Sequence, residues 1–132
     1  MAGTAESELI MAETHLSFYL KAYRIRIFID SLRGIGSPSR ICIMLEENGK
    51  RLLIAPYTHK DFRSHRVPSK VYEGTGAMEI SSYKLTHIIA GLQKWDLSRS
   101  YRVPGKVLED KKVAIFDLGA AEPIEHGELE DG

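Results

Sequence analysis

The sequence predicts a small α+β domain with a mostly antiparallel sheet, several hairpins and one main helix. Short apolar runs with a period of two recur along the chain, and turn residues separate them. Only one segment, about residues 81–94, has the apolar period of a helix. At 132 residues the chain is long enough for one modest core. Because a single helix cannot cover much sheet, we expect it to pack on one face.

The first elements follow from local patterns. Residues 23–30 alternate between apolar and polar, which predicts a half-buried strand, and residues 31–36 then form one helical turn that glycine ends. The apolar runs 41–45 and 51–55 flank Asn48-Gly49, a pair that tolerates positive φ and predicts a hairpin. Pro56 closes its second strand, since it has no N–H for a ladder.

The second half of the chain gives a strand, the helix and another hairpin. A short strand is expected near residues 77–80, and Ser81 or Ser82 then caps the helix. The apolar side chains that we expect on its buried face lie at positions i, i+3, i+4 and i+7: Leu85, Ile88, Ile89 and Leu92. Residues 101–108 pair with 113–118 around the polar turn 109–112.

Composition divides the chain into three parts. We expect residues 1–15 to be flexible or a short helix, residues 16–118 to form the single domain, and residues 119–132 to be an acidic, mostly disordered tail. No apolar run approaches the ~20 residues of a membrane span, and the acidic start lacks the pattern of a signal peptide. The single Cys42 excludes an internal disulfide. These features predict a cytoplasmic protein that does not contact membranes.

The most informative feature is a repeated motif. Residues 63–73 read RSHRVPSKVYE and residues 99–109 read RSYRVPGKVLE, so eight of eleven positions are identical at an offset of 36. A fixed offset is typical of a duplicated supersecondary unit, here RSxRVPxKV. If both copies are extended, the Arg and Lys four positions apart project from one face, roughly 13 Å from each other. The alternative is a structural strand-turn unit whose lysine only faces solvent.

Charge is segregated although the formal net charge is zero. Residues 21–112 hold all 18 Lys and Arg but nine of the 18 Asp and Glu, so this body carries +9 and the flanks carry −9. A basic body favours an anionic partner, nucleic acid first, DNA or RNA. The alternative is an ordinary domain surface with acidic tails.

These two observations select the candidate site. We expect phosphate contacts from the repeated cations Arg66, Lys70, Arg102 and Lys106, supported by Arg63, Arg99, Arg24 and Arg26. The alternative function is a protein-interaction or scaffold module that recruits a partner through a sheet edge. Either module is expected to work as a homodimer.

Catalytic and metal-binding patterns are not found in the sequence. The five histidines and Cys42 show no ligand spacing, no Gly-Lys-Ser/Thr loop is present, and no serine lies in a nucleophile elbow. The sequence therefore predicts a non-enzymatic protein without metal or cofactor.

One segment resembles a known family. Residues 35–41, IGSPSRI, follow a strand and Gly34, and resemble the strand-to-proline segment of AbrB/SpoVT-type and MraZ-type DNA-binding domains. MraZ-type proteins are similar in length and hold two copies of their motif. Here a strand, where the family has a helix, is expected after Pro38. The resemblance implies DNA binding. The chain is also similar in general character to small bacterial proteins of phage or mobile-element origin.

Overall fold

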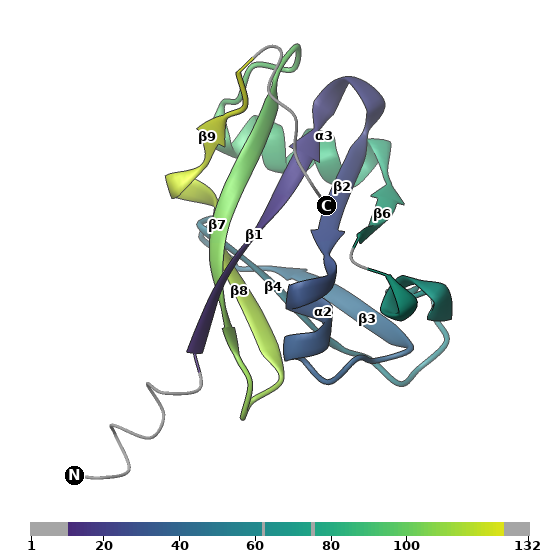
Figure 1. Cartoon of the computed structure of the whole chain (residues 1–132). Coiled ribbons are helices and arrows are strands. Elements are labelled where there is room, and N and C mark those ends of the chain that lie inside the picture. Colours follow the sequence, from purple (N-terminus) through teal and green to yellow (C-terminus); the bar gives the residue numbers. More distant parts are fainter. Residues whose placement is uncertain (1–10, 62, 75, 126–132) are drawn as a thin grey trace, which may run out of the picture.

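A computed structural model describes residues 11–61, 63–74 and 76–125. The described part forms one antiparallel sheet in the order β5-β3-β4-β8-β7-β1-β2-β6, with β9 added beside β7. The sheet curls until it is nearly closed like a barrel, which confirms the α+β, mostly antiparallel prediction (Figure 1). The strands are β1 Met11–Tyr19, β2 Arg24–Phe28, β3 Arg40–Leu45, β4 Arg51–Pro56, β5 Ser64–Arg66, β6 Ala77–Ser81, β7 Ser100–Leu108, β8 Val113–Asp117 and β9 Glu122–Pro123.

The helices are short and lie around the sheet. Two α-helices are present among the described residues: α2 (Ile29–Gly34), which overlaps the helical turn expected over residues 31–36, and α3 (Tyr83–Gln93), so a single main helix is not confirmed. The 3₁₀ turns are η1 Leu20–Ala22, η2 Ser69–Glu73 and η3 Leu118–Ala120. Helices α2 and η2 lie side by side below β2 and β6 (Figure 1). Arg33 of α2 joins them by donating to the carbonyls of Tyr72 and Gly74, at 3.1 and 3.3 Å.

Both predicted hairpins are present. Strands β3 and β4 pair around Gly49, whose φ of 72° is the positive value that the Asn-Gly signal predicts, and β4 ends at Pro56. Strands β7 and β8 form the second hairpin. Because turn chemistry is local, the sequence alone was enough to locate both.

The predicted boundaries of the domain were wrong at the first strand. Residues 11–15, expected to be flexible or helical, are the first half of β1, which pairs with β7 along its whole length. The first half of this strand contains polar residues such as Glu13 and Thr14, so no apolar alternation marks it in the sequence. It forms a strand by pairing with β7, which lies far along the chain. Residues 1–10 lie outside the described residues.

The first residues of the segment expected to be an acidic, mostly disordered tail are ordered. Residues 119–125 are part of the fold: η3 leads into β9, and the N–H of Ile124 donates to the carbonyl of Ser100 at 2.9 Å. Residues 126–132 lie outside the described residues.

The sheet has one buried and one outer face. In β7 the side chains of Tyr101, Val103 and Val107 are buried, and those of Arg102 and Lys106 point outward, as strand alternation requires. The largest fully buried side chains of the core are Phe18, Phe116, Leu16, Ile25, Ile27, Leu32, Ile35, Ile41, Leu52, Ile54, Ile89 and Leu118.

Helix α3 lies where the sequence predicts a helix, but the face that it buries differs from the predicted one. Ser82 is its N-cap and accepts from the N–H of Leu85 at 3.1 Å, and Ile89 is fully buried. Ile88 and Leu92, expected to be buried, are 46% and 54% exposed. Thr86 fills the inward face instead, because its hydroxyl donates to the carbonyl of Ser82 at 2.7 Å and needs no water.

Candidate functional site

The two copies of the repeated motif have different backbones. The first copy forms β5, passes through extended Pro68 (φ −59°, ψ 134°) and turns into η2. The second copy continues as one strand, β7, to Leu108. The duplication of one supersecondary unit is therefore not confirmed, and Lys70 does not share a strand face with Arg66.

The copies differ in the residue that follows proline, Gly105 in the second copy and Ser69 in the first. A Cβ atom on Gly105 would clash with Cδ1 of Phe116 and would lie 2.6 Å from the carbonyl oxygen of Ile115. Glycine thus lets β7 pack directly against β8. The first copy has Ser69 at this position, where η2 begins.

Acidic residues from outside the motif face the cations of the second copy. In the strand register Arg102 lies opposite Glu122 of β9, and Lys106 lies opposite Glu13 of β1. Arg99 is 3.9 Å from the carboxylate of Glu125. Opposite charges across a strand pair are mutually stabilising, so these predicted site residues already have acidic neighbours.

The predicted residues of β2 are also paired. The carboxylate of Glu79 on β6 is 3.3 Å from Nη1 of Arg24 and 2.8 Å from Nη2 of Arg26. Nε of Arg26 donates to the same carboxylate at 3.0 Å. These arginines join the edge strand β6 to the sheet.

The first copy has the reverse arrangement. Arg66 of β5 lies directly opposite Arg40 of β3; Arg66 is exposed and Arg40 is half-buried, whereas Ile41 next to Arg40 is fully buried. Nη1 of Arg40 donates to Oγ of Ser64 at 2.7 Å. In the described part of the chain, no carboxylate lies within ion-pairing distance of Arg40, Arg66 or Lys70. Like charges directly opposite each other destabilise a strand pair, so this arrangement has a cost without a counter-ion.

Tyr57 extends this row of side chains. Its N–H donates to the carbonyl of Arg40 at 2.9 Å, which places Tyr57 beside Arg40 on the far side from Arg66. The guanidinium of Arg63 lies over the Tyr57 ring, 5.7 Å from its centre, and the His59 ring approaches at 5.4 Å.

Asp61 fixes the Tyr57–Arg63 pair. Its Oδ2 accepts from the Tyr57 hydroxyl at 2.9 Å and from Nη2 of Arg63 at 3.1 Å. The bond from Arg63 holds the pKa of Asp61 below its usual range, so the carboxylate stays charged. Desolvation, followed by the bond to Asp61, raises the pKa of Tyr57, so its ring remains a neutral phenol.

We call this region the edge surface and define it as Arg40, Tyr57, Arg63, Arg66 and Lys70. Three of its members were predicted from the repeated motif. Arg40 and Tyr57 were missed because they join it only through the pairing of β3 with β5 and β4, which no local pattern encodes.

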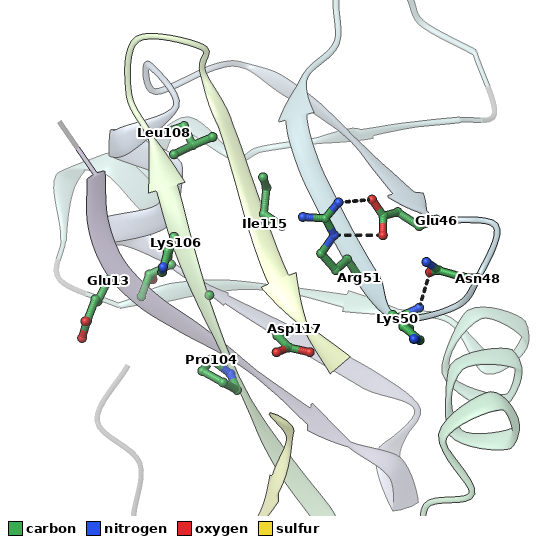
Figure 2. Close-up of a pocket in the computed structure, with 12 residues that line it drawn as sticks. Glu13, Glu46, Asn48, Lys50, Arg51, Pro104, Lys106, Leu108, Ile115 and Asp117 are labelled. Atoms are coloured by element: carbon green, nitrogen blue, oxygen red, sulfur yellow. Dashed lines mark hydrogen bonds and ion pairs between the residues drawn. The ribbon is translucent and has the colours of Figure 1, made fainter. Parts of the chain in front are cut away.

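A groove lies elsewhere on the outer face, between the first half of β1, the β7–β8 hairpin and the β3–β4 turn (Figure 2). Its volume is about 880 Å³. Its apolar lining comes from Pro104, Leu108 and Ile115. Its charged lining is balanced and consists of Glu13, Glu46, Asp117, Lys50, Arg51 and Lys106.

One ion pair orders the β4 side of this groove. Arg51 donates through two nitrogens to the Glu46 carboxylate, at 2.9 and 2.7 Å (Figure 2). This bonding lowers the pKa of Glu46. The groove therefore has an apolar floor and fixed charges of both signs.

The described residues hold no arrangement that would bind a metal ion or cross a membrane as a helix. Among residues 11–61, 63–74 and 76–125, no three His, Cys, Asp or Glu side chains are placed to hold a metal ion. In the same ranges no helix has the length and apolar character that a membrane crossing requires. No protein-family model, curated protein or solved structure matches this chain.

Proposed function

We propose that this protein is a non-enzymatic binding domain for nucleic acid and that it makes its phosphate contacts through the edge surface. The observation that carries the proposal is the difference between the two copies of the motif. Both have the same Arg and Lys residues, but Arg102 and Lys106 of the second copy lie opposite carboxylates of neighbouring strands, whereas Arg66 of the first copy lies opposite Arg40, and no carboxylate of the described residues lies within ion-pairing distance of Arg66 or Lys70.

The missing counter-charge fits a phosphate backbone. Arg66 and Arg40 repel each other across the strand pair, and an anion bound between them removes that repulsion. Arg63 and Lys70 flank the pair along the chain, at the end of a loop and in η2. Long cationic side chains on firm backbone are what phosphate contacts require.

The proposed site is narrower than the one that the sequence predicts. Arg66, Lys70 and Arg63 remain, and Arg40 is added. The cations of the second copy and of β2 are proposed to act within the fold, through their acidic neighbours: Arg99, Arg102, Lys106, Arg24 and Arg26.

The test is a salt titration of binding to labelled DNA and RNA, both duplex and single-stranded. In the variant Arg66→Gln/Lys70→Gln, each lost contact should lower the slope of log K against log salt by about 0.9 on duplex or about 0.7 on single strands. The matched control is Arg102→Gln/Lys106→Gln, which removes the same charges from the second copy and should keep the wild-type slope. If the wild type binds neither DNA nor RNA at low salt, the proposal is wrong.

The groove favours a second candidate, a protein-interaction module. Its apolar floor and balanced charges suit an extended peptide that carries an apolar side chain between an acidic and a basic one. This candidate predicts no affinity for nucleic acid in the wild type, and the same titration therefore decides between the two. The expectation of a homodimer applies to either candidate and is measured by sedimentation.

A further inference from the structure

We infer that the edge surface binds single-stranded nucleic acid, with a base stacked on the Tyr57–Arg63 pair and phosphates on Arg40 and Arg66. This inference rests on the proposed function and deepens it, because it names the class of nucleic acid. Proteins that bind single strands combine cations that follow the backbone with aromatic or guanidinium planes that stack on bases.

The first support is the order of side chains across the sheet. Arg66, Arg40 and Tyr57 form one row that crosses β5, β3 and the residue after β4. Neighbouring strands are about 4.8 Å apart, so the row places two cations and an aromatic ring within about 10 Å. One nucleotide presents its phosphate and its base over a similar span.

The second support is that the stacking plane is already fixed. Asp61 holds both the Tyr57 hydroxyl and the Arg63 guanidinium, at 2.9 and 3.1 Å. Arg63 lies over the Tyr57 ring, and 64% of its side chain is exposed. A base can therefore stack on the outer side of the guanidinium without a rearrangement of the pair.

The third support is that this surface suits a single strand better than a duplex. Base faces are hidden inside a duplex, and a duplex is read by a helix or a β-ribbon that enters a groove. Helix α3 instead exposes Ile88 and Leu92, side chains without the charge that phosphates attract. The edge surface itself is a short strand edge with a flat aromatic–cation pair beside it.

The experiment compares three labelled probes of equal length with the full chain: a single strand, a duplex, and an abasic strand that keeps its phosphates. The wild type should bind the single strand about 5- to 150-fold more tightly than the abasic strand, the ratio that corresponds to one stacked base. It should also prefer the single strand to the duplex.

Two variants separate stacking from charge. Arg63→Lys keeps the charge but removes the plane, so single-strand affinity should fall while the salt slope stays unchanged. Tyr57→Leu should have the same effect, and its thermal melting curve reports whether it folds. Arg99→Lys is the matched control, because Arg99 occupies the equivalent position of the second copy, outside the edge surface, and the affinity of this variant should be that of the wild type.

The outcomes separate this inference from the proposed function. If the wild type binds no probe, the proposed function fails. If it binds abasic and normal strands equally, or if Arg63→Lys binds as the wild type does, nucleic-acid binding stands and the stacking inference is overturned. A preference for the duplex also overturns it.

Discussion

Residues 99–109 run through the middle of the sheet between β1 and β8, whereas residues 63–73 lie at its edge and leave it after Pro68. The central copy meets Glu13, Glu122 and Glu125 from segments that are remote in sequence. In the edge copy Arg66 meets another arginine, Arg40, while Arg63 is paired with Asp61, two residues before it in the chain. The comparison teaches that neighbours across the sheet, and not the motif itself, decide whether its cations are available to a partner.

The largest expected effect comes from exchanging the residues that make the two backbones differ. Gly105→Ser places a Cβ against Phe116 and the backbone of Ile115, and should lower the free energy of unfolding by about 1–3 kcal/mol. The reciprocal change, Ser69→Gly, should cost at most about 1 kcal/mol, because it only loosens a 3₁₀ turn. Urea denaturation of both variants measures the difference. Equal costs would show that position 105 does not separate the two copies.

A smaller effect follows from giving the edge copy an acidic neighbour. Arg40→Glu would place a carboxylate opposite Arg66 and should raise the free energy of unfolding by about 0.2–1 kcal/mol. It should also weaken nucleic-acid binding, because Arg66 then has an internal partner. Denaturation and the salt titration check the two results. A less stable variant would mean that the two arginines do not repel each other in the folded chain.

The opposite change removes the acidic neighbours of the central copy. In Glu13→Gln/Glu122→Gln, the cations Lys106 and Arg102 lose the charges that face them. If these acidic neighbours alone keep Lys106 and Arg102 from binding phosphate, their removal should steepen the slope of log K against log salt. The expected change is at most about 0.7 on single strands for each new contact. Stability should change little, since exposed opposite charges that face each other contribute at most about 1 kcal/mol. An unchanged slope would mean that something other than these acids keeps the central copy from binding.

The smallest effect concerns pH. His65 occupies the position of Tyr101, and burial lowers its pKa below the ordinary value near 6.5. The unfolded chain then takes up this proton more readily than the folded chain. The stability linked to His65 is therefore complete above about pH 6.5 and is lost as the pH falls through the folded-state pKa.

The variant His65→Gln tests this linkage because glutamine does not titrate. Between about pH 7 and pH 5 its melting temperature should fall less than that of the wild type. Parallel curves for the two proteins would show that His65 is protonated equally in the folded and unfolded states.

Local signals explain how much of the fold could be predicted. The hairpin at Asn48-Gly49, the strand at β2 and the cap at Ser82 were located correctly, because turn residues, alternation and capping act within a few positions. Strand β1 was missed, because its polar first half becomes a strand only by pairing with β7. The exposed face of α3 was missed for a related reason: periodicity offers several faces, and packing against the sheet selects one of them.

The candidate site, like the fold, could be predicted only where local sequence signals define it. The motif drew attention to Arg66 and Lys70, but it gave equal weight to Arg102 and Lys106. Only the strand order shows that Arg102 and Lys106 face acids and that Arg66 faces Arg40. Tyr57 and Arg40 could not be found from sequence, since their proximity to Arg63 and Arg66 is a product of the fold.

The pairing of β1 with β7 also has a consequence for the timing of folding. Leu16 and Phe18 become buried through a strand whose residues, Val103 and Tyr101, are synthesised last but for the C-terminal segment. Strand β1 can pair early with β2, its neighbour in sequence, but its other edge stays open until β7 has been synthesised. Closing so long a loop slows folding, as for other sheets rich in non-local pairs. We therefore expect the pairing of β1 with β7, which nearly closes the sheet, to form later than the local hairpins.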